Sequence, residues 1–305
     1  MGLCCRRMRK SRRQRGSGMK DGKRKNLIYT ILLVVFAGIF LYSAYQLGSY
    51  YLQGRRYRKN MKQLSEEIGG GIAESTKELE ESLRVNRDRL VFPDEKEHEL
   101  VAYVSNFTEE VPDQWREQYS VLVSKNRDCI GYIEIPDTIL SYPVMFTPSR
   151  YDYYLDRGFE KKYDARGVPF MDAATKIGLS RNYIIYGHDM RDGTSFGLLR
   201  DFKKKEFAEA HPYVYFNTSV SAGVYQLMYV CRSKIYAKDA DVFKYYKYGG
   251  VLSEEQFNTY VKEMRARALF VSGVEAQWGD ELLSLSTCDH YVEDGRLILV
   301  YKRIR

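Results

Sequence analysis

The fold of this chain is decided by a segment near its end, Leu282-Leu283-Ser284-Leu285-Ser286-Thr287-Cys288-Asp289-His290, and by the run Gly295-Arg296-Leu297-Ile298-Leu299-Val300-Tyr301 after it. A β-hairpin is predicted, because two apolar runs that favour strands flank a polar connection whose Glu-Asp-Gly end is typical of turns. If residues 288 and 296 close the hairpin, 286 lies opposite 298 and 284 lies opposite 300. Directly opposed side chains are about 5 Å apart, so Cys288 faces Arg296.

Because strand side chains alternate, the hairpin has two different faces. One face is apolar and is expected to be core, with Leu283, Leu285, Leu297, Leu299 and Tyr301. The other carries small side chains at Ser284 and Ser286 and ends in the Cys288 thiol beside Arg296. The guanidinium keeps its charge, so it can stabilise a thiolate and donate hydrogen bonds to an oxyanion. A lone cysteine is more often a small buried side chain, but Arg296 and Asp289 favour a reactive one here.

These residues resemble a known family. The run 284–288, Ser-Leu-Ser-Thr-Cys, is similar to the Thr-Leu-x-Thr-Cys signature of the sortases, membrane-bound cysteine transpeptidases of Gram-positive bacteria. Ser284 replaces the first Thr and keeps its hydroxyl. The family also has an Arg on the next strand, matched by Arg296, and a His at the end of an earlier strand. His188 matches that histidine within Tyr-Ile-Ile-Tyr-Gly-His-Asp-Met at 183–190, and the resemblance extends from Asn126 to Arg303.

The resemblance makes His188 the expected partner of Cys288. A cysteine nucleophile reacts as its thiolate, which a neighbouring base or a positive field must supply. His188 ends a strand-like run and enters a glycine-containing loop at 192–197, from which it could also protonate a leaving amine. His290 is nearer to Cys288 in sequence. On one continuous strand, however, the two side chains would project in parallel from Cα atoms about 6.6 Å apart.

The family chemistry implies a role for each of these residues. Cys288 attacks the peptide bond after a Thr in the C-terminal sorting signal of a surface protein, His188 protonates the departing amine, and Arg296 binds substrate and stabilises the oxyanion. An amine of a peptidoglycan precursor or a pilin then resolves the thioester. Ser286, Thr287 and Asp289 are supporting residues, and Asp289 could orient His188 or its loop. The chemistry needs no cofactor and no metal.

Eight short strand-like runs follow residue 126: 130–135, 142–146, 168–171, 182–187, 213–216, 223–236, 282–288 and 296–302. They predict a mainly β fold, an eight-stranded and closed or nearly closed barrel. Between the sixth and seventh runs, residues 253–270 begin with a Ser-x-x-Gln capping box and predict a long helix packed on the barrel. Its apolar stripe is Phe257, Tyr260, Val261, Met264 and Ala268. This helix, helices before the first strand and the short Cys-to-Arg spacing resemble the class B branch of the sortases.

The charge of the chain is concentrated at one end. The 305 residues have a formal net charge of +8, but residues 1–25 carry eleven Lys or Arg and one acid, Asp21, a balance of +10 that leaves −2 for the rest. A basic terminus next to an apolar segment indicates membrane topology. A nucleic-acid partner is therefore not expected.

Residues 27–47 contain no charge and are expected to form one transmembrane helix. At 21 residues they can cross a hydrocarbon core of about 30 Å. A cleaved signal peptide is the alternative, but the run is longer than a typical signal core and no small-x-small cleavage site follows it cleanly. Five cationic residues follow the run closely, against eleven before it. The positive-inside rule thus predicts a single-pass protein of the cell membrane with a cytoplasmic N-terminus and an extracellular catalytic domain.

Four parts are expected: a basic cytoplasmic tail at 1–26, the transmembrane helix at 27–47, a stalk with packing helices at 48–112 and the sortase catalytic domain at 113–305. In the stalk, apolar spacing predicts helices at 75–90 and 97–107, with a partly disordered spacer as the alternative for 55–95. Asp113 is a candidate cap for a further helix at 115–126.

The cysteine count argues against a disulfide framework. Cys4 and Cys5 lie in the tail and are expected to be free thiols. Beyond the membrane segment there remain Cys129, Cys231 and Cys288, which is an odd number. Cys129 and Cys231 accompany strand-like runs and are expected to fill the core.

Three other functions use the same residues. A cysteine peptidase would pair thiol and imidazole with water as the acceptor, and only an added amine separates it from a transpeptidase. A membrane-tethered binding module with an inert thiol would not react at Cys288 with a thiol-reactive substrate analogue. An L,D-transpeptidase also pairs Cys with His, but the sequence has no Ser-His-Gly-Cys element. Fold alone would not distinguish these functions.

Overall fold

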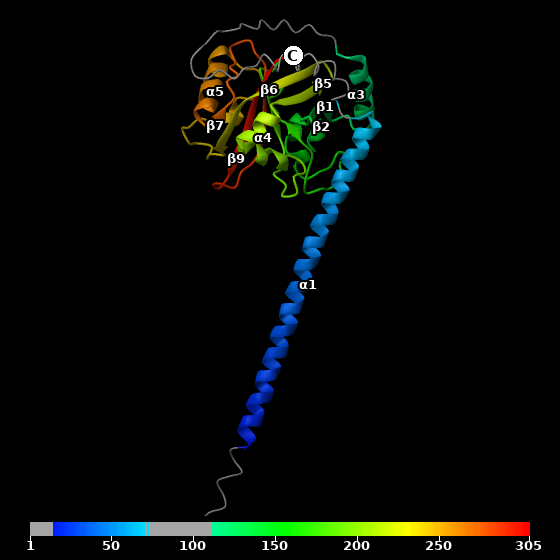
Figure 1. Ribbon diagram of the computed structural model, residues 1–305, viewed down its shortest axis with the longest axis vertical. Coiled ribbons are helices and arrows are strands. Elements are labelled where there is room, and N and C mark those ends of the chain that lie inside the picture. The colour runs from blue at the N-terminus through cyan, green and yellow to red at the C-terminus, as the bar shows by residue number, and fades with distance from the viewer. Residues whose placement is uncertain (1–14, 71, 73–110) are drawn as a thin grey trace, which may run out of the picture. The chain divides into compact units, whose positions relative to one another are not determined.

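The computed structural model describes residues 15–70, 72 and 111–305 (Figure 1). The chain divides into two units, Met1–Arg56 and Tyr57–Arg305. The helices expected at 75–90 and 97–107 lie outside the described residues, as do Cys4 and Cys5.

The first unit contains most of one long helix, α1 (Arg15–Glu67). All residues from 25 to 48 are exposed, including large apolar side chains such as Phe36 and Leu41. Such a surface is unfavourable in water and favourable among lipid tails. Lys25–Glu67 includes a stretch that is long and apolar enough to cross a membrane, so the predicted segment could span one.

The second unit is built on a β-barrel. Its strands are β1 (Cys129–Glu134), β2 (Ser141–Met145), β3 (Phe170–Met171), β4 (Asn182–Tyr186), β5 (Tyr213–Thr218), β6 (Ala222–Lys234), β7 (Ala268–Val271), β8 (Leu282–Cys288) and β9 (Gly295–Arg303). The strand order is β5-β1-β2-β3-β4-β8-β9-β6-β7, and β5 also pairs with β6. That pairing closes eight strands into a barrel, so the predicted architecture is confirmed. Each predicted run corresponds to one barrel strand.

The helix predicted at 253–270 is shorter than expected, because its last part forms the additional strand β7. Helix α5 (Glu254–Ala266) begins at the predicted capping box, in which Ser253 and Gln256 exchange side-chain to backbone hydrogen bonds. It ends at Ala266, and Ala268 lies in β7 instead. The reason is that β5 pairs with β6 only up to Gln226, so the backbone groups on that edge of β6 are without strand partners beyond it. Because unpaired strand groups need partners, β7 pairs with β6 over the next part of that edge.

The remaining helices of the described residues are short, namely α3 (Asp113–Lys125), α4 (Lys205–Ala210) and the 3₁₀ turns η2 (Pro148–Arg150), η3 (Tyr153–Leu155), η4 (Gly197–Lys203) and η5 (Tyr245–Lys247). Figure 1 shows α3 next to β1 and α5 next to β7, on different sides of the barrel. The predicted cap Asp113 is wrong, because Asp113 is already the first helical residue and Pro112 precedes the helix as its N-cap.

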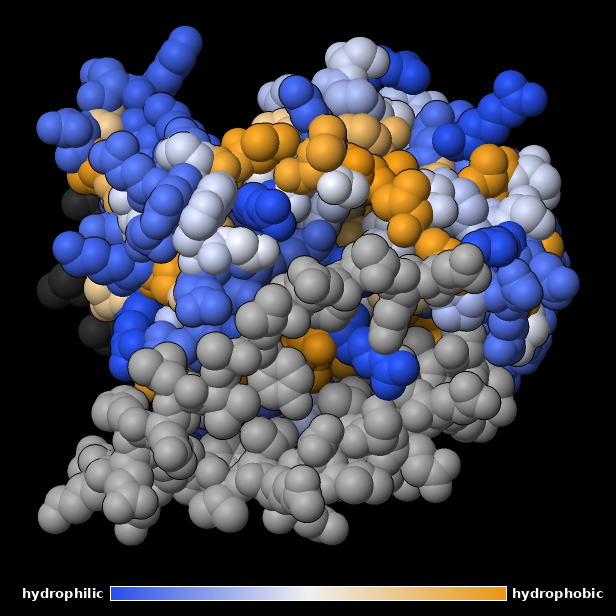
Figure 2. Space-filling model, turned by 90° about the horizontal axis from the view of Figure 1, so that it is seen from above, coloured by the Kyte–Doolittle hydropathy of each residue, from blue (hydrophilic) through white to orange (hydrophobic). Residues whose placement is uncertain are grey.

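Apolar side chains pack on both sides of the β6–β9–β8 wall. Inside the barrel lie the predicted core residues of the hairpin, Leu283, Leu285, Leu297, Leu299 and Tyr301. Outside, α5 packs Phe257, Tyr260 and Met264 against the wall and buries the Cys231 side chain with them. Figure 2 shows a face on which a band of hydrophobic residues lies between hydrophilic ones. Apolar groups thus also contribute to the surface, as in most folded proteins.

Two helices join the core from outside the barrel. Trp115 of α3 is fully buried, and its indole Nε1 donates to the carbonyl of Thr218 at 2.7 Å. The last turns of α1 belong to the second unit and bury Tyr57, Met61 and Leu64 in the same core. Part of the segment expected as stalk or packing helix is therefore bound to the barrel.

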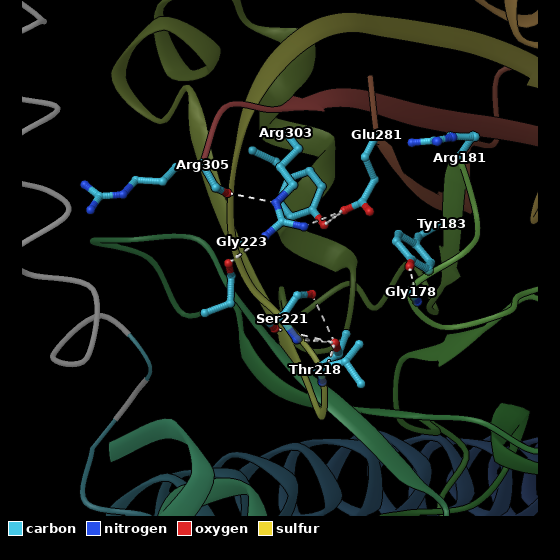
Figure 3. Close-up of polar contacts among 12 residues, drawn as sticks. Gly178, Arg181, Tyr183, Thr218, Ser221, Gly223, Glu281, Arg303 and Arg305 are labelled. Atoms are coloured by element: carbon cyan, nitrogen blue, oxygen red, sulfur yellow. Dashed lines mark hydrogen bonds and ion pairs between the residues drawn. The ribbon is translucent and has the colours of Figure 1, made fainter. Parts of the chain in front are cut away.

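A largely buried ion pair lies at the end of β9 remote from Arg296 (Figure 3). Arg303 is 3.4 Å from the Glu281 carboxylate, and both side chains are largely buried. The Tyr225 hydroxyl donates to the same carboxylate at 2.6 Å. Arg303 also donates to the carbonyls of Ala222 and Arg305, both at 3.0 Å. Glu281 therefore connects the start of β8 with β6 and β9.

Glu281→Ala should lower the free energy of unfolding by about 2 to 4 kcal/mol, because it removes the carboxylate from a largely buried guanidinium and a buried phenol. Urea unfolding of the detergent-solubilised chain measures this change. The matched control is Glu160→Ala, whose carboxylate pairs with Lys162 where the two side chains are 66% and 82% exposed; we expect a change within about 0.5 kcal/mol. Equal effects of the two substitutions would contradict a structural role for the buried pair.

Candidate active site

The predicted hairpin is formed by β8 and β9 in the predicted register, with Cys288 opposite Arg296. The turn depends on Gly295, because a Cβ at this position would lie 2.1 Å from the carbonyl oxygen of Asp289. With glycine there, the Asp289 amide donates to the Gly295 carbonyl at 2.9 Å. The hairpin is thus closed one residue beyond Cys288.

The serine face of β8, which the sequence predicted to carry small side chains, is covered by two tyrosines. The Ser284 hydroxyl is 2.7 Å from that of Tyr260, and the Ser286 hydroxyl is 2.7 Å from that of Tyr245. Both serines are buried. Their small side chains leave room for two tyrosines from α5 and η5. Only the Cys288 end of this face is partly exposed.

His188 follows β4, which runs parallel to β8. The registered pairs end two residues before His188 on β4 and two before Cys288 on β8. Beyond them, the Gly187 amide donates to the Ser286 carbonyl at 3.2 Å and the Thr287 hydroxyl donates to the Gly187 carbonyl at 2.8 Å. These two bonds keep the strands together up to the level of His188 and Cys288.

The three predicted catalytic residues therefore lie on neighbouring strands or directly after one, with Cys288 on β8, Arg296 on β9 and His188 in the loop that follows β4. The sheet order β4-β8-β9 puts Cys288 between His188 on one side and Arg296 on the other. Within the described part of the chain, no hydrogen bond joins the Cys288 thiol to either side chain. The Arg296 Nη1 group donates to the carbonyls of Asp294 and Gly295, at 3.1 and 2.9 Å. The strand register, and not a direct bond, brings the three together.

The imidazole of His188 has a partner that the sequence did not indicate. Its Nε2 atom is 2.7 Å from the backbone carbonyl oxygen of Leu155, in η3. The preceding Gly187 is required by close packing, because a Cβ there would lie 2.6 Å from the Phe196 ring. The Leu155 carbonyl and the Phe196 ring thus restrict the orientation of the histidine and of its backbone.

Asp289 does not contact His188 in the described structure. Its carboxylate is buried and accepts from Lys203 Nζ at 3.0 Å and from Arg232 Nε at 2.9 Å. Asp289, which was predicted as a supporting residue, is therefore held by Lys203 of η4 and Arg232 of β6.

His290 lies in the turn after β8 and is 84% exposed. Its Nε2 atom is 3.9 Å from the Asp189 carboxylate, which also lies 3.1 Å from Arg200. Burial raises the pKa of Asp189, although Arg200 and His290 oppose this change. The imidazole of His290 is thus directed toward an acid next to His188 and not toward the thiol.

Tyr245 is a residue of the site that sequence reasoning missed. Burial raises the pKa of its phenol to about 12; the Ser286 hydrogen bond and the Arg296 charge oppose this rise, and Cys288 adds to it. Its hydroxyl is 2.7 Å from that of Ser286, which lies two residues before Cys288 on the same face of β8, so the phenol covers this end of the face. Tyr245 stands in a tyrosine-rich run with no strand or helix pattern, so no signal in the sequence connects it to β8.

The arrangement can support nucleophilic chemistry. It combines a partly exposed thiol, an imidazole at the end of the adjacent strand and a guanidinium opposite the thiol. The thiol can attack a carbonyl carbon, the imidazole can transfer a proton and the guanidinium can stabilise negative charge. Among residues 15–70, 72 and 111–305, no group of three or more His, Cys, Asp or Glu side chains could hold a metal ion.

The chain is similar in sequence and in fold to proteins named sortase B. The chain is 30% identical to sortase B of Staphylococcus aureus over 191 residues, which cover 62% of this chain and 75% of the relative. The structure of a Staphylococcus aureus sortase B–substrate complex superposes with a TM-score of 0.55 and 27% identity, over 62% of this chain and 86% of the other. A sortase B complexed with triglycine has a TM-score of 0.55 and 26% identity, with the same coverage. No model of a protein family matches the chain.

Of the three cysteines beyond the membrane segment, only Cys288 should react with iodoacetamide in the native protein. Cys129 and Cys231 are 2% and 0% exposed, and burial raises the pKa of Cys129 to about 12 and that of Cys231 still further. Thiolate formation and access are both required for alkylation. Peptide mapping by mass spectrometry after a short exposure measures this reaction, and unfolding in guanidinium chloride should make all three react. Native labelling of Cys231 as fast as that of Cys288 would contradict the assignment.

Proposed function

Because the chain belongs to the class B sortases, a family of cysteine transpeptidases, we propose that it cleaves a C-terminal sorting signal through a thioester on Cys288 and transfers the surface protein to an amine of the cell wall. The observation that carries this proposal is the strand register, which brings His188 and Arg296 to the two sides of Cys288. Cys129 and Cys231 are buried, at 2% and 0% exposure, so a peptide substrate could not reach either thiol.

The first half of the proposed reaction forms the thioester. The Cys288 thiolate attacks the carbonyl carbon of the scissile peptide bond, and an oxyanion develops on its oxygen. Arg296 lies opposite Cys288 on β9 and supplies positive charge and hydrogen-bond donors to this oxyanion. The carbon–nitrogen bond then breaks, and the leaving amine takes a proton from the His188 imidazolium. The products are the thioester on Cys288 and the released C-terminal fragment.

The second half reverses these roles. An acceptor amine attacks the thioester carbonyl, His188 takes the proton that the amine loses, and the Cys288 thiolate leaves. A new amide bond replaces the peptide bond that was broken, so the step needs no energy source and no cofactor. Transfer to an amine competes with transfer to water, and this competition separates a transpeptidase from a peptidase.

The supporting residues act through the backbone of β8. Thr287 binds β8 to the backbone of Gly187, and Ser286 binds Tyr245. The Asp289 carboxylate, between Lys203 and Arg232, holds the chain directly after Cys288. We propose that these three residues position Cys288, because their contacts hold the end of β8 between His188 and Arg296.

The substrate classes follow from what related enzymes bind. One Staphylococcus aureus sortase B structure is a substrate complex, and another sortase B structure contains triglycine. By analogy, the donor is a surface protein with a sorting motif, and the acceptor is a peptidoglycan-precursor or pilin amine. With α1 in the cell membrane and the N-terminus in the cytoplasm, the Cys288 site would face the cell wall, where both substrates occur.

The function is tested with the full chain in detergent, a library of peptides carrying varied four-residue motifs and triglycine as the acceptor. Mass spectrometry should detect peptide fragments joined to triglycine in preference to the hydrolysed acid. Cys288→Ala should lower both products by at least about 10³-fold, since the nucleophile is lost. Cys129→Ala is the matched control and should stay active. Hydrolysed acid alone would indicate a peptidase, and no cleavage would indicate a binding module.

The choice of histidine is tested on one peptide from that library. His188→Ala should lower turnover by about 10²- to 10⁴-fold, the usual contribution of a general acid or base. His290→Ala should keep at least about half of the turnover, because this side chain is mostly exposed and directed toward Asp189. An inactive His290→Ala together with an active His188→Ala would overturn the site as proposed.

A further inference from the structure

The loop that follows His188 is held by its own backbone. The carbonyl of His188 accepts from the amides of Met190 and Phe196, at 3.1 and 2.9 Å. Asp189 and Ser195 form an isolated β-bridge, and Ser195 has a φ of 52°, in the left-handed region that non-glycine residues rarely adopt. Such a conformation persists where surrounding contacts impose it. Contacts from outside the loop therefore contribute to the position of the His188 backbone.

Asp192 is the loop residue that connects the loop to two cations of other segments. Its Oδ1 atom accepts from the Thr194 hydroxyl at 2.6 Å and from the Thr194 amide at 3.3 Å. Its Oδ2 atom faces two guanidinium groups, Arg166 at 3.4 Å and Arg58 at 3.6 Å. One carboxylate thus connects the inside of the loop with two other segments of the chain.

The two arginines differ in burial. The Arg166 side chain is 1% exposed, whereas that of Arg58 is 41% exposed. Burial alone would raise the pKa of Asp192, but the Thr194 hydrogen bonds and the Arg166 charge outweigh it and lower the pKa. Asp192 is therefore ionised at neutral pH, as a partner of two cations must be.

Arg58 brings the end of α1 to this loop. Its neighbour Tyr57 is fully buried, with its hydroxyl against the Ser195 side chain and its ring centroid 5.9 Å from that of Tyr142. Two consecutive residues of α1 thus contact two residues of the loop, Asp192 and Ser195. The last turns of α1 are part of the support of the loop and not a separate stalk.

The segment of Arg166 also approaches the imidazole of His188. Gly167 packs so closely on η3 that a Cβ there would lie 2.6 Å from the carbonyl oxygen of Leu155. That same oxygen is 2.7 Å from His188 Nε2. The segment that holds Asp192 and the carbonyl that orients the imidazole are therefore in contact. Together, these contacts restrict both the backbone of the loop that follows His188 and the orientation of its imidazole ring.

We propose that Asp192 is a positioning residue for His188, held in place by Arg166 and by Arg58 of α1. The proposal rests on the role of His188 in the proposed function. Asp192 touches neither the thiol nor the imidazole in the described structure, so it acts by keeping the His188 loop in one place. A displaced general acid loses rate more than it loses substrate affinity, because its contribution is made at the reacting atoms.

The experiment uses the full chain in detergent and two substitutions. Asp192→Asn keeps the shape of the side chain but removes the charge that faces both arginines, and it should lower kcat by about tenfold with KM changed less than about twofold. Arg58→Met leaves the buried Arg166 pair intact and should lower kcat by about threefold. Arg58→Lys keeps the charge and should restore most of that loss. Lys62→Met is the matched control, because Lys62 pairs only with Glu66 of the same helix among the described residues.

A second measurement does not depend on turnover. NMR spectra of protein labelled at its four histidines, with the His188 signal assigned by His188→Ala, should show that signal shifted or broadened in Asp192→Asn and in Arg58→Met and unchanged in Lys62→Met. An unchanged His188 signal in both Asp192→Asn and Arg58→Met would overturn the proposal, even if the wild-type chain fails to transfer peptides. A shifted signal without transpeptidation would uphold the positioning role and contradict the proposed function.

Discussion

The site depends on the register in which β8 pairs with β4 and β9. Because strand side chains alternate, a shift of one residue in either pairing would turn Cys288 away from the face it shares with its neighbours. The parallel pairing brings the ends of β4 and β8 to the same edge of the barrel, and the antiparallel pairing brings the start of β9 to that edge. A histidine and a cysteine one hundred residues apart are thus made neighbours by backbone hydrogen bonds. The buried serines of β8 protect this register, since a slip would separate Ser284 and Ser286 from their tyrosine hydroxyls and leave buried polar groups without partners.

The position of the chain after His188 is determined in the same way by contacts from distant segments. A strand can place a side chain only as far as its ladder extends, and β4 ends two residues before the histidine. Beyond that point the packing of Gly187 on Phe196, the carbonyl of Leu155 and the contacts of Asp192 take the place of the ladder. These contacts come from η3, from the segment of Arg166 and from α1. The last turns of α1 are therefore connected to the loop that follows His188.

The local patterns of the sequence carried much of the fold. The eight barrel strands, the hairpin register and the capping box of α5 were predictable because each depends on alternation or on residues a few positions apart. The family resemblance added the pairing of Cys288 with His188, which no local pattern indicates. What could not be predicted depends on partners distant in the sequence. Strand β7 forms because β6 has an uncovered edge, and Asp289 binds Lys203 and Arg232, which lie 86 and 57 residues away. The packing of Tyr245 and Tyr260 on the serine face also joins residues far apart in the sequence, 41 and 24 positions from the serines that they contact.

The pattern of charge around the site also follows from such distant contacts. An acid directly follows each of two predicted catalytic residues, Asp189 after His188 and Asp289 after Cys288. Both acids are matched by cations from other elements, Arg200 for the first and Lys203 with Arg232 for the second. With Arg296 opposite the thiol, these cations outnumber the two carboxylates. The positive charges near Cys288 can therefore stabilise an oxyanion that forms next to it. In sequence, Asp289 could be taken for a third catalytic residue, but its two cationic partners show that its carboxylate is engaged in an ion-pair cluster that anchors the end of β8.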